Sequence, residues 1–206
     1  MKVQQVKFKQ SFTFEDGSVL PEITIAYHTY GNLNEQGDNV IWVCHALTAN
    51  SDVAEWWPGM LGKDLLFDPD THFIICANIL GSCYGSTGPA SIRPGSDKPY
   101  GREFPLVTVR DMIKAHQLLR KHLGIRKILL ITGSSLGGQQ AIEWAYSEPD
   151  LFDCLVPIAT NAIASPWGIA FNESQRMALE SDPDFLAGRF TEKSAGLRAA
   201  RSIALL

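Results

Sequence analysis

The sequence predicts an α/β fold in which a mostly parallel sheet is flanked by helices. Short continuous apolar runs, typical of strands buried on both faces, recur along the chain, and segments with helical spacing lie between them. Strands that alternate with helices form parallel sheets with right-handed crossovers. A third observation is a serine bracketed by Gly133 and Gly137, placed where one such strand meets one such helix.

Composition narrows the class of protein. The 206 residues, 45% hydrophobic and 19% charged, suit a globular chain with a sizeable core. A net charge of −4 with scattered Lys and Arg argues against a nucleic-acid partner. The opening segment MKVQQVKFKQ has no apolar stretch behind it, and no run approaches the roughly 18 apolar residues of a membrane span. We expect a cytoplasmic protein with a small-molecule partner and no membrane contact.

The four cysteines are widely spaced. Cys44, Cys76 and Cys154 fall inside apolar runs, where cysteine behaves as a small buried hydrophobe. We therefore expect these three to be buried, and neither a metal site, a disulfide nor a cofactor is expected. That pattern fits a reducing compartment.

The N-terminal half contains alternating and then continuous apolar segments. Residues 3–14 and 23–30 alternate around a turn and predict an antiparallel pair at a sheet edge. Residues 40–44 and 73–77 predict buried strands. The region 50–70 between them has no regular pattern, and the loop 81–104 is too long for a simple connection, so we expect it to be functional or mobile.

The second half continues the alternation and then changes character. The pattern predicts helices and buried strands in turn, followed by two helices with no strand between them; the expected ranges are helix 108–123, strand 127–132, helix 136–147, strand 154–160, and helices 167–180 and 192–206. We expect a core over residues 1–164 and the first helices of an insertion over 165–206. The chain stops inside the last helix without a cap, so we expect the C-terminal part of the fold to be missing.

The bracketed serine has the pattern of a nucleophile elbow. In G-x-S-x-G the glycines remove side chains where the backbone bends from strand into helix, which exposes the Ser135 hydroxyl. The N–H of Leu136 then lies at a helix N-terminus, where it favours developing negative charge. A second donor on such folds comes from the loop after an earlier strand, so the N–H of Leu47 is the candidate.

A general base for this serine is harder to find. His45 is adjacent to the candidate oxyanion loop, but serine nucleophiles on elbows of this kind precede their acid and their histidine in the chain. The remaining histidines also precede Ser135 and are interpreted as structural or surface residues: His28, His72, His116 and His122. No histidine follows Ser135, so the expected acid and base are absent from this sequence.

Several blocks in order resemble the homoserine O-acetyltransferase family over nearly the whole chain. They are His45 to Thr48, Asn78 to Pro89, Asp111-Met112, Gly133 to Trp144, and Ala170 to Arg176. The resemblance implies an α/β-hydrolase core with a helical lid. It also implies transfer of an acetyl or succinyl group from acyl-CoA to the hydroxyl of L-homoserine, in methionine biosynthesis, and a homodimer built through the lid.

Site residues follow from the same resemblance. Ser135 is the implied nucleophile, with Leu47 and Leu136 as oxyanion donors. The resemblance also implies that Arg201 binds the substrate carboxylate, a role here called the clamp. A guanidinium suits this role because it binds a carboxylate through two parallel hydrogen bonds. Arg198 and Arg176 are rival clamps, and an ordinary surface salt bridge is the alternative.

Several points stay open. The segment Gly81 to Gly88 either lines the CoA entrance or forms a rigid turn cluster, and its Gly81-Ser82 and Tyr84 depart from the family pattern. The acyl donor and the acceptor, homoserine or serine, are therefore undetermined. Family members carry another half-domain with the triad acid and histidine, so little turnover is expected from this chain alone. A serine hydrolase or esterase, and a non-catalytic fragment, remain as alternatives.

Overall fold

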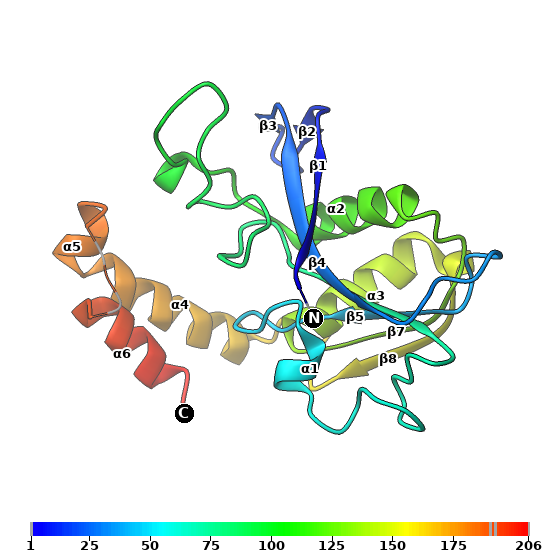
Figure 1. The fold of residues 1–206 in the computed structure, drawn as a ribbon. Helices are drawn as coiled ribbons and strands as arrows, with labels where there is room; N and C mark the ends of the chain where they lie inside the picture. Colours follow the sequence, from blue (N-terminus) through cyan, green and yellow to red (C-terminus); the bar gives the residue numbers. More distant parts are fainter. Residues whose placement is uncertain (1, 190, 192, 206) are drawn as a thin grey trace. The chain divides into compact units, whose positions relative to one another are not determined.

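A computed structural model describes residues 2–189, 191 and 193–205 (Figure 1). The chain forms two compact units, Met1–Ala162 and Ile163–Leu206, and each is described by itself. None of the described helices is both long and apolar enough to cross a membrane.

The first unit is built on a six-stranded sheet in the order β1-β4-β6-β5-β7-β8. Its strands are β1 (Gln4–Phe8), β4 (Ile23–Tyr30), β5 (Val40–Cys44), β6 (Phe73–Ala77), β7 (Ile128–Ser134) and β8 (Phe152–Ile158). The last four run parallel, whereas β4 is antiparallel to both β1 and β6. A small separate hairpin joins β2 (Phe12–Thr13) to β3 (Val19–Leu20). The parallel strands therefore bring their carboxyl ends to one edge of the sheet.

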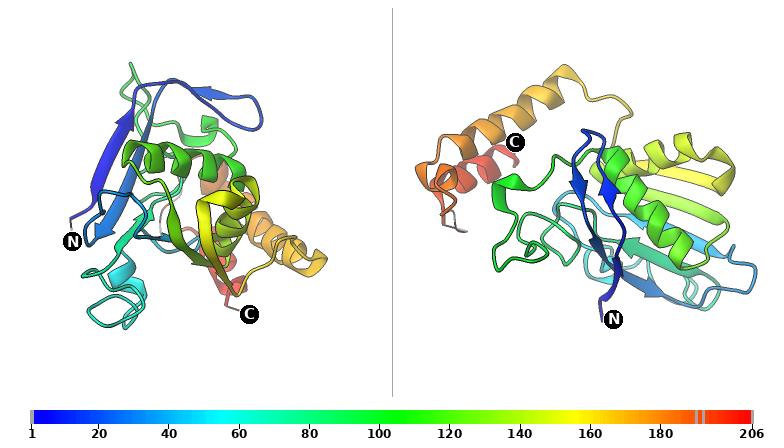
Figure 2. Two further views of the ribbon diagram at one scale, coloured as in Figure 1. Left: turned by 90° about the vertical axis from the view of Figure 1, so that its right-hand side faces the viewer. Right: turned by 90° about the horizontal axis from the view of Figure 1, so that it is seen from above.

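Helices and apolar loops cover the two faces of this sheet differently. The helices of the first unit are α1 (Val53–Trp56), α2 (Val109–His122) and α3 (Leu136–Ser147), with short 3₁₀ turns η1 (Gly101–Glu103) and η2 (Pro149–Leu151). Figures 1 and 2 show α2 and α3 side by side on one face. Trp42 and Ile131 pack with Leu119 and Trp144 in the core beneath these helices. The opposite-parity residues, such as Ile41 and Val43, pack against α1 and the loop that follows it.

Helix α2 has a strong start signal. Thr108 at its N-cap accepts from the N–H of Asp111, and the Asp111 carboxylate accepts in return from the N–H of Thr108. The buried Asp111 carboxylate also accepts from the N–H of Glu15, 2.9 Å away. This one side chain fixes both the helix and the N-terminal turn beside it.

The second unit is helical. It contains α4 (Pro166–Glu180), α5 (Pro183–Leu186) and α6 (Ala195–Ile203). The N–H of Gly196 donates to the Asp182 carboxylate over 2.7 Å, and a Cβ at residue 196 would lie 2.6 Å from the Ala178 carbonyl oxygen. Glycine thus allows α6 to pack tightly against α4.

Most expected elements are present, within a few residues of the expected bounds. The edge pair is confirmed between β1 and β4, although residues 12–20 form a separate hairpin. The region 50–70 contains the short helix α1, and α5 follows Asp182, which caps it ahead of a proline at its first turn. Glu192 and Leu206, at the ends of the last expected helix, lie outside the described residues.

Two burial expectations are wrong for a common reason. Residues 154–160 were expected to form a buried strand, but Leu155, Val156 and Ile158 of β8 are 37–41% exposed, and Cys154 is exposed as well. Strand β8 is the last strand of the described sheet and pairs only with β7. An edge strand also tolerates Pro157, which has no N–H to donate. Cys44 and Cys76, on central strands, are buried as expected.

Candidate active site

Ser135 occupies a strained turn between β7 and α3. Its φ is 52° and its ψ is −121°, a region that costs a non-glycine residue about 1–3 kcal/mol unless its surroundings enforce it. Three hydrogen bonds enforce it here. The Ser135 N–H donates to the Ile158 carbonyl at 3.1 Å, and the Ser135 carbonyl accepts from the Thr160 hydroxyl at 2.7 Å and from the Gln139 N–H at 3.1 Å. The side chain is exposed at the end of the strand.

The glycines around Ser135 are required by close packing. A Cβ at residue 133 would lie 2.5 Å from the Gly137 carbonyl and 2.6 Å from the Cys44 carbonyl oxygen. A Cβ at residue 137 would clash with the same Cys44 oxygen, and one at residue 138 would clash with Thr160. The helix α3 can start immediately above the ends of β5 and β7 only because these positions have no side chain.

The two candidate oxyanion donors come from neighbouring strand ends. Cys44 at the end of β5 pairs with Gly133 of β7, so the segments carrying Leu47 and Leu136 leave the sheet next to each other. Leu136 is the first residue of α3, where the N–H has no partner within the helix. Leu47 lies in the turn closed by the Ala49 N–H and the Ala46 carbonyl. For the Leu47 N–H, no hydrogen bond to another described residue is present.

Gln140 ties these two segments together from beneath. Its side-chain Nε2 donates to the His45 carbonyl at 3.3 Å and to the Leu136 carbonyl at 3.2 Å, while its Oε1 accepts from His116 Nε2 at 3.1 Å. The Gln140 side chain is completely buried. A buried amide with all its groups in use fixes the relative position of what it contacts, here the loop of Leu47 and the start of α3.

His45 is a structural residue rather than a base. Its Nε2 accepts from the Ile79 N–H at 3.2 Å, so its proton lies on Nδ1, which donates to the Ala46 carbonyl at 2.8 Å. The ring is fully buried, and burial lowers the pKa of His45, which keeps it neutral. With both nitrogens engaged, His45 has no lone pair available for Ser135.

His116 completes the buried network. It lies between Trp42 and Trp144, with ring centroids 5.7 and 5.9 Å away. Burial lowers its pKa to about 4, so the ring is neutral and donates from Nε2 to Gln140. Its Nδ1 is buried and has no hydrogen-bond partner among the described residues.

The other three histidines also have contacts away from the elbow. His28 Nδ1 lies 2.8 Å from the Ser51 hydroxyl, His72 Nδ1 lies 2.9 Å from the Thr71 hydroxyl, and the His122 ring packs edge-on to Phe8. Within the described residues, no histidine is hydrogen-bonded to Ser135.

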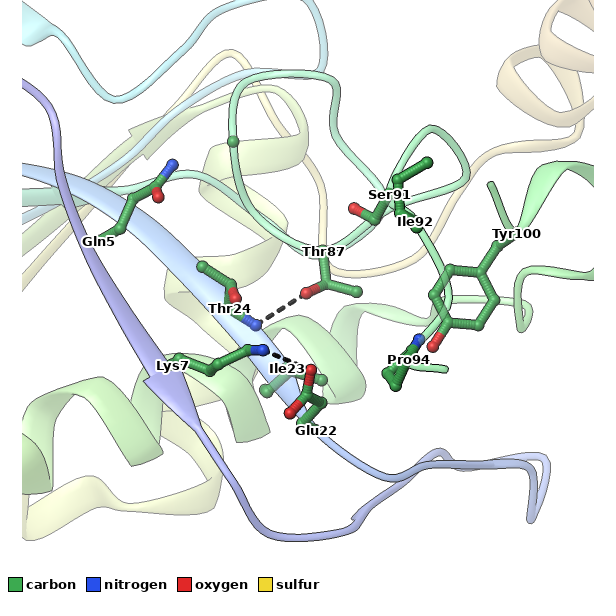
Figure 3. Close-up of a pocket in the computed structure, with 11 residues that line it drawn as sticks. Gln5, Lys7, Glu22, Ile23, Thr24, Thr87, Ser91, Ile92, Pro94 and Tyr100 are labelled. Atoms are coloured by element: carbon green, nitrogen blue, oxygen red, sulfur yellow. Dashed lines mark hydrogen bonds and ion pairs between the residues drawn. The ribbon is translucent and has the colours of Figure 1, made fainter. Parts of the chain in front are cut away.

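Two cavities flank the long loop after β6. One, of about 650 Å³, is lined by Leu47, residues 79–84, Pro89, residues 101–102, residues 104–107 and Met112. The other, of about 280 Å³, lies between β1, β4 and residues 85–100 (Figure 3). Several of its polar groups are already paired, since Lys7 contacts Glu22 at 2.5 Å and Thr87 Oγ1 accepts from the Thr24 N–H at 2.7 Å. Only the first cavity includes a candidate site residue.

A model of the α/β hydrolase fold matches residues 39–205. The chain belongs to the α/β hydrolase fold family. The core of this α/β hydrolase has the expected mostly parallel sheet with flanking helices, and the fold prediction is confirmed.

Comparisons with individual proteins show which members of this fold family the chain resembles in sequence and structure. The chain is 46% identical to the homoserine O-acetyltransferase of Trichormus variabilis over 197 residues, covering 94% of this chain and 55% of that protein. A homoserine O-acetyltransferase structure from Bacillus anthracis superposes with a TM-score of 0.88 at 28% identity, covering 100% of this chain and 60% of that one. An acetylester hydrolase from Corynebacterium glutamicum superposes with a TM-score of 0.86 at 29% identity, covering 99% of this chain and 58% of that one.

These likenesses confirm the resemblance to the homoserine O-acetyltransferase family that the sequence motifs indicated. The chain spans about half the length of the curated relatives it matches.

The arginines proposed as clamps differ in their surroundings within the second unit. Arg176 pairs with Glu173, with its Nη2 2.5 Å from the carboxylate oxygen. Arg198 and Arg201 lie on α6, and both side chains are exposed. Neither makes an ion pair with a described residue. Arg201 and Arg198 therefore keep their guanidinium groups available, whereas Arg176 does not.

Gln140 was not singled out by sequence reasoning. The signal was present, because Gly137, Gln140, Ala141 and Trp144 have the spacing of one buried helix face. A glutamine on such a face needs partners within the core. Periodicity places it inside the protein, but it does not say which carbonyl groups it meets.

Proposed function

We propose that this chain forms the nucleophile-bearing part of an acyltransferase that moves an acetyl or succinyl group from acyl-CoA to the hydroxyl of L-homoserine. The observation that carries the proposal is the strained, exposed Ser135 at the turn into α3. The buried Gln140 ties the start of that helix to the loop that contains Leu47, which supports the two proposed backbone donors. The 46% identity to a homoserine O-acetyltransferase supports this acceptor. In this proposal the reaction belongs to methionine biosynthesis in the cytoplasm, with no metal or cofactor, and residues 165–206 begin a lid.

The reaction proceeds in two displacements. The Ser135 oxygen attacks the thioester carbonyl, the carbon–sulfur bond breaks, and CoA leaves as a thiol carrying the serine proton. The homoserine hydroxyl then attacks the acyl-serine, its proton passes to the serine oxygen, and the O-acyl product leaves. The N–H groups of Leu47 and Leu136 stabilise the oxyanion in both steps, and Arg201 holds the acceptor carboxylate.

Each displacement needs a base, and no histidine among the described residues is hydrogen-bonded to Ser135 to serve as one. All five histidines precede Ser135, and the described contacts assign each to another position. Loss of a triad base lowers the rate by several orders of magnitude. We therefore expect the 206-residue chain alone to turn over very slowly.

An esterase is the second candidate, favoured by the structural likeness to an acetylester hydrolase. It would use the same Ser135 and oxyanion donors but pass the acyl group to water. The two functions are separated by incubating the full product of the gene with acetyl-CoA, with and without homoserine. CoA release that depends on homoserine supports the transferase, and release indifferent to homoserine supports the esterase.

Ser135 itself is tested by mass spectrometry of the acyl-enzyme. Ser135→Ala in the full product of the gene is expected to abolish the acetylated species, because Ser135 carries the exposed hydroxyl at the strained turn. Ser134→Ala is the matched control in the same motif and is expected to retain it. An acetylated peptide persisting in the Ser135→Ala protein would contradict the assignment.

A non-catalytic role for the isolated chain is tested by its own kinetics. Turnover by the 206-residue chain at the rate of a complete enzyme would exclude that role.

A further inference from the structure

A cavity of about 360 Å³ lies where β4, the end of β6 and the start of α1 meet. It is here called the Asn78 cavity, and it is lined by Val3, His28, residues 50–52, Glu55, Asn78 and Tyr84. We propose that it binds a primary ammonium group carried on a short alkyl chain. Neither Ser135 nor a candidate oxyanion donor lines this cavity, so the inference is independent of the proposed acyl transfer.

The Asn78 amide has one acceptor that is not used within the protein. Asn78 is 3% exposed, and its Nδ2 donates to the Ser51 hydroxyl at 2.9 Å and to the Tyr84 carbonyl at 2.7 Å. Because a carbonyl oxygen can only accept, the contact with Tyr84 fixes which end of the amide is the nitrogen. The Oδ1 atom is buried and has no hydrogen-bond partner among the described residues. A buried acceptor of this kind costs free energy that a ligand recovers by donating a hydrogen bond.

The charges that line the cavity favour a cation. Among the described residues of the lining, Asp52 and Glu55 are acidic, and only His28 can carry a positive charge. His28 Nε2 lies 3.8 Å from the Asp52 carboxylate. Even when His28 is protonated, two carboxylates and one imidazolium leave the lining with a net negative charge. A cleft lined by one sign of charge attracts ligands of the opposite sign.

Both carboxylates keep acceptor capacity for such a ligand. Asp52 Oδ1 accepts from the Tyr30 hydroxyl at 2.6 Å, and Glu55 Oε2 accepts from Asn50 Nδ2 at 2.9 Å. A carboxylate can accept about four hydrogen bonds, so these contacts orient the two groups without saturating them. A primary ammonium group has three N–H donors. Asn78, Asp52 and Glu55 supply an acceptor for each of them within one cavity.

An organic cation fits this cavity better than a metal ion. Among the residues that the structure describes, no group of three or more His, Cys, Asp or Glu side chains is placed to hold a metal. The rest of the lining also suits an alkyl ammonium group, since the Val3 and Tyr84 side chains are 42% and 43% exposed. An alkyl chain can pack on Val3, and the face of an aromatic ring attracts a cation.

The experiment is an NMR titration of the isotope-labelled 206-residue chain at neutral pH and constant ionic strength. The probe is propylammonium chloride. The side-chain amide signals of Asn78 and the main-chain N–H signal of Asp52 are expected to shift and to saturate together. Tetramethylammonium has the same charge but no N–H, and propanol has a donor but no charge. Both are expected to bind at least about tenfold more weakly, because neither forms a charge-assisted hydrogen bond.

Two variants test the acceptors. Asp52→Asn keeps an acceptor for the Tyr30 hydroxyl but removes the charge, so it is expected to weaken propylammonium binding about tenfold. Glu55→Gln is expected to weaken it about threefold, because Glu55 is exposed and its charge is screened. Glu35→Gln is the matched control, since Glu35 is also exposed but does not line the cavity. If Asp52→Asn does not fold, the two glutamate variants remain as the test.

A primary ammonium group can come from a free amine or from the start of a polypeptide chain. The titration is therefore repeated on the chain acetylated at its amino terminus. An unchanged Kd assigns the cavity to a free amine. Binding that appears only after acetylation assigns it to the α-amino group of the chain itself.

Three results would overturn the proposal: no saturable shift in either form of the chain, equal affinity for tetramethylammonium, or an unchanged Kd in both Asp52→Asn and Glu55→Gln. None of these measurements uses Ser135 or an acyl group. Failure of the proposed acyl transfer would therefore leave this result unaffected, and loss of amine binding would leave the acyl transfer unaffected.

Discussion

The side-chain amide of Gln140 donates to the main-chain carbonyl of His45 over 3.3 Å. This hydrogen bond links helix α3 to the loop after β5, and those two segments carry the candidate oxyanion donors. The bond is buried, so its geometry is not relaxed by water. The positions of Leu47 and Leu136 relative to each other depend on it.

Gln140→Leu is expected to destabilise the protein by about 1–3 kcal/mol, because it leaves the His45 carbonyl and the His116 Nε2–H buried without partners. Urea unfolding measures the change. Gln139→Leu is the matched control, since Gln139 is only partly buried and its side chain bonds to Asn161 at an exposed position; a loss below about 0.5 kcal/mol is expected there. Equal losses in the two variants would contradict the structural role of Gln140.

Gly137→Ala is expected to cost about 3 kcal/mol, because the new methyl group overlaps the Cys44 carbonyl oxygen and neither backbone segment can move freely. Gly168→Ala in α4 provides the comparison. Its methyl group would lie 3.5 Å from the Ser165 hydroxyl oxygen, which is ordinary contact, and alanine favours a helix. Thermal unfolding should show a large decrease in Tm for the first variant and none for the second.

His116 predicts a dependence of stability on pH. Its pKa is about 4 in the folded protein and about 6.5 when unfolded, so the unfolded state binds the proton more readily. The free energy of unfolding should therefore fall as the pH decreases from about 6.5 to about 4, by up to about 3 kcal/mol from this residue, and change little from it below that. Burial lowers the pKa of His45 as well, which adds to the effect in the same direction.

The variant His116→Phe isolates this contribution. A phenyl ring occupies the space between Trp42 and Trp144 but cannot titrate. We expect lower stability at neutral pH, because Gln140 Oε1 loses its donor, together with a shallower pH dependence between about 4 and 6.5. Urea unfolding at a series of pH values measures both. An unchanged slope would show that another group accounts for the pH dependence.

Arg201→Lys in the full product of the gene is expected to raise the KM for homoserine about tenfold, because a lysine cannot bind a carboxylate through two parallel hydrogen bonds. Arg176→Lys is the control, since Arg176 is engaged with Glu173. The rate of acyl-enzyme formation from acetyl-CoA alone should be unchanged in both. If Arg176→Lys raised the KM for homoserine and Arg201→Lys did not, Arg176 of α4, and not Arg201 of α6, would bind the substrate carboxylate.

Local signals in the sequence determined the elements and the elbow. Apolar periodicity predicts β5, β6, β7, α2 and α3, because each depends on neighbouring residues and on which faces are buried. The bracket of Gly133 and Gly137 around Ser135 predicts the turn, since only glycine fits where α3 starts against the ends of two strands. The resemblance to a known family could also be identified from the sequence, because its motifs, such as Gly133 to Trp144, are short local segments that occur in a fixed order along the chain.

The tertiary structure decided which polar groups meet and which strands have two neighbours. Apolar composition made residues 154–160 look buried, but burial of a strand depends on what pairs with its second edge, and that is not a local property. The link from His116 through Gln140 to His45 joins residues 24 and 95 positions apart in the chain. No periodicity encodes such a contact. It follows from packing α2 and α3 on one face of the sheet, where Gln140 of α3 meets His116 of α2 and the main chain that follows β5.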